Sequence, residues 1–255
     1  MIFLKTPEQV NVMRKANLIV RDTLLMVGDR IKAGVTTAEV DRWVKEYIES
    51  RGAKPSCLGY EGYPASTCIS IDDVVVHGIP SPKTYIEEGQ IVGVDLCAYI
   101  DGYHGDSART FPIGKVHKDK LDLVKTAEEA FFEGIKGITA ANRIGDISSA
   151  IQTYVEGKGY SVVRALTGHG IGREMHEDPA VPNYGEKGRG VRLRPGMTIA
   201  VEPMINLGRY DVYTERDGWT VRTRDHSPSA HYENTVVVWD DGVDSDAVAT
   251  FAVIL

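Results

Sequence analysis

The sequence has few of the features that nucleic-acid-binding or membrane-spanning proteins need. Acidic residues outnumber basic ones, 36 Asp and Glu against 29 Lys and Arg, which gives a formal charge of −7. Because nucleic acids and anionic lipids attract basic patches, this balance argues against both as partners. No stretch approaches the roughly 20 apolar residues of a membrane span, and the start lacks the basic-then-apolar order of a signal peptide. We therefore expect a cytoplasmic protein.

Cysteine is also scarce. The three cysteines, Cys57, Cys68 and Cys97, form no CxxC pair, and an odd count fits reduced thiols better than a disulfide framework. Low-complexity segments and long linkers are absent. With 255 residues, of which 42% are hydrophobic and 25% charged, the chain is long enough to bury a sizeable core. We expect one domain over residues 1–255.

An internal repeat runs through the chain. The segment IKAGVTTAEVDRWVKEYIESRGA (31–53) aligns without gaps with ITAANRIGDISSAIQTYVEGKGY (138–160), 107 residues later. Further on, GQIVGVD (89–95) matches GMTIAVE (196–202) at the same spacing. A spacing that is kept across two separate blocks indicates two related halves of the chain. We place them at about 6–113 and 118–239.

Each half has the pattern of two helices followed by strands. Thr6 and Pro7 are suited to begin the first helix. Thr36 or Thr37 is suited to cap the second, which Gly52 would end. The remaining pattern predicts strands over 66–113, helices over about 118–139 and 147–155, and strands from 160 onward. This order predicts an α+β fold in which two pseudo-symmetric halves pack helices on an antiparallel sheet, with a site between them.

Two aspartates lie where buried charge is expected to be costly. Asp95 ends the apolar run QIVGVD, and Asp106 lies in the segment that returns after Asp101-Gly102, a dipeptide typical of two-residue hairpins. With this turn, Cys97 pairs with Asp106, so Asp95 and Asp106 become diagonal neighbours on one face. Two such charges are tolerated if cations bind between them. His104 falls on the same face, and its spacing alone does not exclude it as a ligand.

Other segments add candidate ligands. Glu202 occupies the repeat position of Asp95, at the end of MTIAVE, and Glu233 begins a valine-rich strand. His169 is flanked by glycines that allow close approach. Taken singly, Glu202 could belong to a structural ion pair, Glu233 could be a solvated strand end, and His169 could be an ordinary surface or core histidine. Together, the candidates are Asp95, Asp106, His169, Glu202 and Glu233.

Four carboxylates and one imidazole suit two divalent cations. Two such ions neutralise four carboxylates, and an oxygen-rich set with one histidine favours Co, Mn, Fe(II) or Zn. A pair of ions about 4 Å apart can share one water and lower its pKa. The composition of the site therefore predicts a hydrolase.

These motifs, taken in order, resemble those of the type I methionine aminopeptidases, which have the pita-bread fold of creatinase-like metallopeptidases. The resemblance covers about Leu4 to Trp239. Besides the two aspartates, it rests on HGIP (77–80), TGHGIG (167–172), MHE (175–177), VEPMI (201–205) and HYENTVVV (231–238).

The resemblance implies roles for individual residues. Asp95, Asp106, His169, Glu202 and Glu233 would hold two ions, with Asp106 and Glu233 bridging both. His77 and His176 would contact the substrate's peptide group, and Glu202 would move a proton. The substrates would be peptides and nascent chains with N-terminal methionine and a small second residue. The protein would act as a monomer, and docking on the ribosome is left open.

The methionine side chain would bind in a pocket of soft and aromatic residues, which suit a thioether. By resemblance, these are Cys57, Tyr60, Tyr63, Cys68, Met175 and Trp219. The chain departs from relatives at Glu61, where many have His, at Val76, where Cys is common, and at Met175, where an aromatic residue is common. The effect of these departures on substrate preference is open.

Two alternatives remain at the level of sequence. X-Pro-specific pita-bread peptidases usually carry an additional N-terminal domain, for which this chain has no room. Non-catalytic pita-bread binding proteins lose metal ligands, whereas all five ligand positions are filled here.

Overall fold

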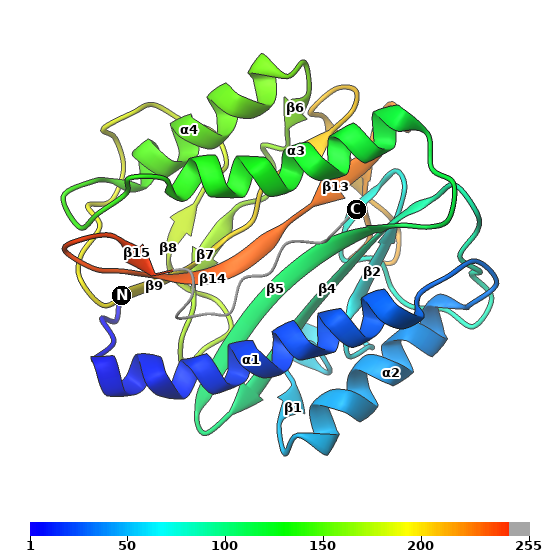
Figure 1. Cartoon of the computed structure of the whole chain (residues 1–255), viewed down its shortest axis with the longest axis horizontal. Helices are drawn as coiled ribbons and strands as arrows, with labels where there is room; N and C mark the ends of the chain where they lie inside the picture. Colours follow the sequence, from blue (N-terminus) through cyan, green and yellow to red (C-terminus); the bar gives the residue numbers. More distant parts are fainter. Residues whose placement is uncertain (245–255) are drawn as a thin grey trace.

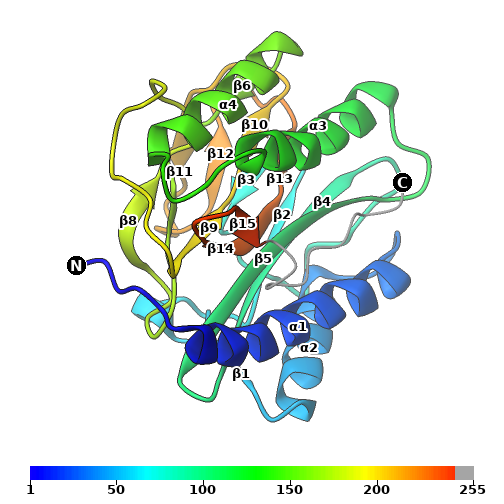
Figure 2. The same cartoon turned by 60° about the vertical axis from the view of Figure 1, so that its left-hand side comes forward.

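Two pairs of helices and a long curved antiparallel sheet make up most of the molecule (Figures 1 and 2). The computed structural model describes residues 1–244, so the last eleven residues of the predicted domain, 245–255, lie outside the described part. The helices are α1 (Pro7–Arg30), α2 (Thr37–Ser50), α3 (Lys118–Ile135) and α4 (Ile144–Gly157), and a short 3-10 turn covers Tyr60–Gly62.

The main sheet runs through both halves in the order β1-β4-β5-β14-β9-β7-β8. Its strands are β1 (Lys54–Pro55), β4 (Ile91–Ile100), β5 (Tyr103–Pro112), β14 (Glu233–Val238), β9 (Met197–Val201), β7 (Gly168–Gly170) and β8 (Glu177–Val181). Two further strands join it, β2 (Cys68–Ile71) on β4 and β15 (Val243–Asp244) on β14. The pairing of β5 with β14 joins the two halves.

Two three-stranded sheets complete the described fold. One has the order β13-β10-β6, with strands β13 (Ser229–His231), β10 (Met204–Asn206) and β6 (Ser161–Val162). The other has the order β11-β12-β3, with strands β11 (Val212–Thr214), β12 (Val221–Thr223) and β3 (Val74–Val76). The second of these pairs distant segments, since β3 belongs to the first half of the chain.

The predicted helix starts are confirmed by their caps. Thr6 caps α1 and exchanges side-chain and main-chain hydrogen bonds with Gln9. Thr36, the first of the two threonines considered, caps α2 and forms the same arrangement with Glu39. Each such capping box satisfies main-chain donors that the first helical turn leaves free. These local signals are strong enough to be read from sequence.

The repeat is present in the fold as an arrangement of helices and strands. Helix α2 begins at residue 37 and α4 at residue 144, and they end at 50 and 157, so both ends are 107 residues apart. Gly52 and Gly159, which follow them, both have positive φ, 74° and 87°. Positive φ is the conformation in which glycine ends helices without a Cβ clash. The two halves are therefore pseudo-symmetric, as predicted.

Two predicted helix boundaries are wrong by three or four residues, and helix α4 also extends to Gly157, two residues past the predicted end. Helix α3 ends at Ile135 rather than near 139, because Gly137 takes a positive φ of 67° and turns the chain. Helix α4 begins at Ile144 rather than Ile147, since the Asp146 side chain accepts a hydrogen bond from the Arg143 main chain and starts the helix earlier. Neither shift moves a candidate site residue.

Each helix pair has its own hydrophobic core. Side chains of α1 and α2 pack against β4 and β5, whereas those of α3 and α4 pack against β9, β13 and β14. The cores leave the junction between β5 and β14 as the place where the halves meet. None of the helices in residues 1–244 combines the length and apolar character needed to cross a bilayer.

Candidate metal centre

The β4–β5 hairpin has the predicted register. Asp101 and Gly102 both have positive φ, 52° and 87°, which is the conformation of a two-residue type I′ turn. Cys97 is consequently the Cα partner of Asp106, and Asp95 is the partner of Ala108. The two aspartates therefore lie diagonally on one face, as expected.

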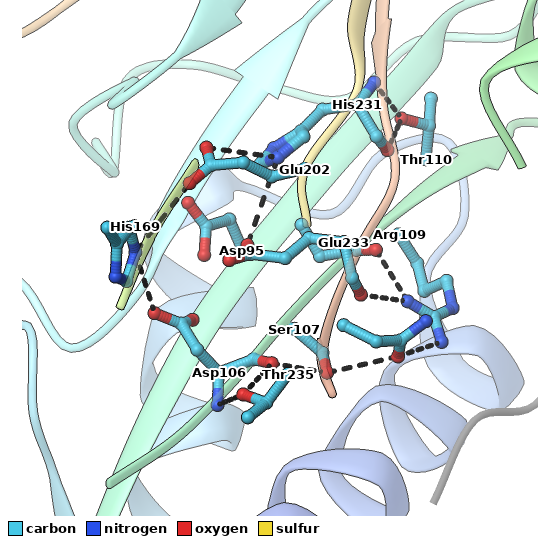
Figure 3. A network of polar contacts seen from close by, with 12 residues as sticks. Asp95, Asp106, Ser107, Arg109, Thr110, His169, Glu202, His231, Glu233 and Thr235 are labelled. Carbon is cyan, nitrogen blue, oxygen red and sulfur yellow. Dashed lines mark hydrogen bonds and ion pairs between the residues drawn. The ribbon is translucent and has the colours of Figure 1, made fainter. Parts of the chain in front are cut away.

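Glu233 joins the aspartates from the other half of the sheet. It is the Cα partner of Ala108 on the β14 side, while Asp95 is the partner of the same Ala108 on the β4 side. Directly paired residues project to the same face. Three strands thus bring the carboxylates of Asp95, Asp106 and Glu233 together at the junction of the halves (Figure 3).

His169 and Glu202 close the cluster. His169 pairs with Ala200 of β9, and Glu202 follows the end of that strand. The Nε2 atom of His169 lies 3.6 Å from Oε1 of Glu202 and 3.9 Å from Oδ2 of Asp106. Its Nδ1 atom lies 2.9 Å from the Gly170 carbonyl oxygen. A proton held on Nδ1 by this contact leaves the Nε2 lone pair for a metal.

Burial makes the four carboxylates poor anions on their own. Desolvation raises the pKa of Asp95 to about 7. It also raises the pKa of Asp106, Glu202 and Glu233 well above the ordinary range, and neighbouring carboxylates add to each of these shifts. Four adjacent charges of one sign cannot all be held here without compensation.

Arg109 is the nearest arginine along the chain, and its contacts differ from those of a simple counter-ion. Its guanidinium donates to the main-chain oxygens of Ala108 and Glu233, both at 2.7 Å, and to Oδ1 of Asn234 at 2.8 Å. The ion-pair contacts that the structure gives the carboxylates run to His169 and His231. Arg109 braces the strands next to the cluster.

The donors fit divalent cations. Oδ1 of Asp106 is buried without a hydrogen-bond partner in the described chain. Ligand atoms of Asp106, His169 and Glu233 lie within 4.8 Å of one another, and so do those of Asp95, His231 and Glu233. Glu233 belongs to both groups, as a bridging carboxylate would. The set of mostly oxygen donors with imidazole matches first-row divalent metals.

A cavity of about 390 Å³ opens on this cluster. It brings together all the residues predicted for the methionine side chain and the peptide group. The lining consists of Cys57, Tyr60, Glu61, Tyr63, Cys68, His77, Asp95, Asp106, Met175, His176 and Trp219. Its apolar wall belongs to one small core cluster of thiols, Met175 and aromatic rings.

The two predicted substrate-contacting histidines lie at different depths. His77 is half-buried, with a positive φ of 58°, and desolvation lowers its pKa to about 4. His176 is exposed; its ring centroid lies 4.3 Å from that of His169. The Nδ1 atom of His176 lies 2.7 Å from the Tyr60 hydroxyl oxygen, which fixes the orientation of the imidazole.

Two of the positions at which the chain departs from its relatives, Glu61 and Val76, and the candidate ligand His104 lie near the site. Glu61 is exposed at the rim, with φ 47°, and Val76 is buried in β3 beside His77. His104, which spacing did not exclude, has Nδ1 2.9 Å from the Ser56 hydroxyl. It is absent from both described ligand groups.

His231 was not among the residues predicted from sequence, although it lies at the site. Its Nε2 atom is 3.8 Å from Oε2 of Glu202 and 3.8 Å from Oε2 of Glu233. Desolvation lowers its pKa to about 3. The signal was available: His231 precedes Glu233 by two positions, and residues two apart in an extended strand share a face.

Comparisons with known proteins agree with this geometry. Residues 11–240 match the model of metallopeptidase family M24. The chain is 50% identical to a methionine aminopeptidase of Clostridium acetobutylicum over 95% of this chain and 97% of that one. It superimposes on the methionine aminopeptidase of Rickettsia prowazekii with a TM-score of 0.94 at 42% identity, covering 96% and 98% of the chains.

A more distant structure supports the architecture alone. The prolidase of Pyrococcus furiosus matches with a TM-score of 0.79 at 24% identity, over 98% of this chain and 66% of that one. The predicted pita-bread fold is therefore confirmed. By its family match and its full-length relatives, this chain belongs to metallopeptidase family M24.

Proposed function

We propose that this protein removes N-terminal methionine from peptides and nascent proteins whose second residue is small. The observation that carries the proposal is the cavity of thiols, Met175 and aromatic rings that ends at the carboxylate cluster. Sulfur packs favourably against such groups. The activity also agrees with the names of the full-length relatives.

Two divalent ions would be held by Asp95, Asp106, His169 and Glu233, with Glu202 beside His169 as the fifth ligand, and Co, Mn, Fe(II) and Zn are the candidates. When bound, such ions lower the pKa of a water molecule and polarise a carbonyl group. The family supports a divalent metal. The number of ions, their identity and the assignment of the ligands are parts of the proposal.

The protein's own groups would orient the peptide and move its protons. His176, exposed beside His169, would donate a hydrogen bond to the carbonyl oxygen as negative charge develops on it. His77, at the cavity wall, would contact the peptide group. Glu202, whose Oε1 atom lies 3.6 Å from Nε2 of His169, would accept a proton from water and return it to the leaving amine.

A peptide panel tests the function. The full chain is assayed with each candidate metal on Met-Ala-Ser, Met-Lys-Ser and an Ala-Pro peptide. We expect cleavage of Met-Ala-Ser and little of the other two. Preference for Ala-Pro would instead support an X-Pro peptidase, and a chain that binds no divalent ion at neutral pH would support a non-catalytic binding protein. Action in the cytoplasm as a monomer, and docking on the ribosome, are separate parts of the proposal.

A further inference from the structure

His231 is held at the cluster by its main chain. Its N–H donates to the Thr110 hydroxyl at 3.1 Å, and the same hydroxyl donates to its carbonyl oxygen at 2.9 Å. On the other side, it is the Cα partner of Met204 in β10. The residue is 4% exposed, so its ring has little freedom to leave the site.

The ring nitrogen that faces the carboxylates has no hydrogen-bond partner among the described residues. A buried polar atom without a partner is costly, so it calls for an explanation. Figure 3 shows the ring of His231 directed at Glu202 and the Asp95–Glu233 pair. The orphaned atom is therefore aimed into the cluster rather than away from it.

The distances suit a shared ion better than a direct contact. Nε2 lies 3.8 Å from oxygens of both Glu202 and Glu233, which is too long for a hydrogen bond. Metal–nitrogen and metal–oxygen bonds are about 2.0–2.2 Å, so two ligand atoms on one ion lie up to about 4.3 Å apart. Both separations fall inside this limit.

We propose that His231 is an additional metal ligand, which binds through Nε2 the ion held by Asp95 and Glu233. Each ion then has one imidazole, His169 on one and His231 on the other, with Glu233 shared between them. The inference rests on the proposed two-metal function and adds a sixth ligand to it. A nitrogen donor beside the two carboxylates should favour Co, Fe(II) or Zn over the harder Mn at the ion that His231 binds.

The test compares the chelator-stripped full chain with a His231→Gln variant. Glutamine retains size and hydrogen-bonding ability, but its neutral amide is a weaker ligand than imidazole for these metals. Co²⁺ binding is measured by titration calorimetry. Proton NMR of the Co²⁺-loaded chain then counts the strongly shifted, exchangeable N–H signals, one for each coordinated imidazole. His104→Gln is the matched control, because His104 is a half-buried strand histidine, in β5 of the main sheet, that lies outside the ligand groups.

We expect the unmodified chain to bind two equivalents and to show two shifted N–H signals. His231→Gln should lose one signal and weaken one equivalent by at least about tenfold. His169→Gln should lose the other signal, and His104→Gln should change neither measurement.

Different failures have different meanings. An unmodified chain that binds two ions with a single imidazole signal, unaffected by His231→Gln, would overturn the role of His231 and leave the proposed function intact. Unchanged affinity for both equivalents in His231→Gln would do the same. An unmodified chain that binds no Co²⁺ would remove the basis of the proposed function itself.

Discussion

Asp95 and Glu233 are both Cα partners of Ala108, one on each side of strand β5. The two carboxylates come from opposite halves of the chain, 138 positions apart in number. Strand β5 lies between their strands, and the side chain that it places between them on that face is the methyl group of Ala108. Because cross-strand neighbours project together, the space between them depends on the small side chain of Ala108. This arrangement makes the junction of the halves the place where ions can bind.

Enlarging Ala108 should therefore block the centre. In an Ala108→Val variant, the added methyl groups would lie between Asp95 and Glu233, and we expect metal affinity and peptidase activity to fall at least tenfold. Overpacking at this buried position should cost about 1–3 kcal/mol of stability. Calorimetric metal titration and thermal unfolding of the full chain check both effects. Ala150→Val, at a half-buried position of helix α4, is the control for general destabilisation. Equal metal affinity in both variants would contradict the prediction.

A change of charge without a change of shape should abolish activity. Asp106→Asn retains the side-chain volume and the main-chain hydrogen bond to the Thr235 hydroxyl at 3.2 Å, but it removes one proposed bridging carboxylate. We expect turnover of Met-Ala-Ser to fall by about 10³-fold or more, as for the loss of a group essential to charge stabilisation. The circular dichroism spectrum should be unchanged.

Asp101→Asn is the matched control for Asp106→Asn. Asp101 lies on the same hairpin, in the turn, and its carboxylate pairs with Lys15 at the surface at 2.9 Å. Such an exposed pair contributes about 1 kcal/mol or less, and asparagine tolerates positive φ. Activity should remain near normal in this variant. Near-normal turnover in Asp106→Asn would mean that the carboxylate cluster is not the catalytic centre.

The fold could be predicted where local signals and long-range register agree. The Asp101-Gly102 turn determines the whole β4–β5 register, so the positions of Asp95 and Asp106 followed from two residues. The 107-residue repeat then related Glu202 to Asp95 without any structural knowledge. The end of α3 and the start of α4 were harder to predict from the sequence. Gly137 determines the first through a turn and Asp146 the second through a cap, and neither shows in the apolar periodicity.

The site was only partly predictable, for a different reason. His77, His176 and most of the cavity wall come from loops far apart in sequence, so no spacing rule brings them together. Their predicted roles rest on the family resemblance alone. The spacing of His231 and Glu233 places both on one face, but a histidine in a strand is usually structural. The significance of His231 depends on an orphaned nitrogen 3.8 Å from two carboxylates, which is a property of three-dimensional packing.

Removing the metal should make stability depend on pH. Asp95 has a folded pKa of about 7, above its ordinary 3.8, and Asp106, Glu202 and Glu233 shift in the same direction. A carboxyl with a raised folded pKa stabilises the fold at low pH, and this contribution is lost as pH rises through the folded value. Above pH 6.5, the free energy of unfolding decreases by about 1.4 kcal/mol per pH unit for each carboxyl that is still protonated in the folded chain.

The measurement belongs above pH 6.5 because the histidines act with the opposite sign below it. The folded pKa values are about 3 for His169 and His231 and about 4 for His77 and His104, all below the ordinary 6.5. Acid therefore destabilises the fold through these histidines. From pH 6.5 to 8, we expect the Tm of the metal-free full chain to decrease, and saturating Co²⁺ to remove most of the decrease. A metal-free chain whose Tm rises over this interval would contradict the proposed compensation of the carboxylates by cations.

Tyr60 should act on the reaction through His176. The Tyr60 hydroxyl lies 2.7 Å from Nδ1 of His176; if it donates its proton there, Nε2 carries the proton that stabilises the developing negative charge. His176→Ala should lower kcat/KM by about 100-fold, or about 3 kcal/mol. Tyr60→Phe retains the ring in the cavity wall but loses the hydrogen bond, which should cost about 1 kcal/mol, or about fivefold.

The double variant separates positioning from simple packing. If Tyr60 acts by orienting His176, adding Tyr60→Phe to His176→Ala should cause no further loss, because residues in one hydrogen-bonded unit are not additive. Tyr47→Phe is the control, since the Tyr47 hydroxyl contacts Arg51 on the exposed face of α2. Steady-state kinetics on Met-Ala-Ser measure all four variants. A fivefold loss that persists in the His176→Ala background would show that Tyr60 acts on the substrate independently of His176.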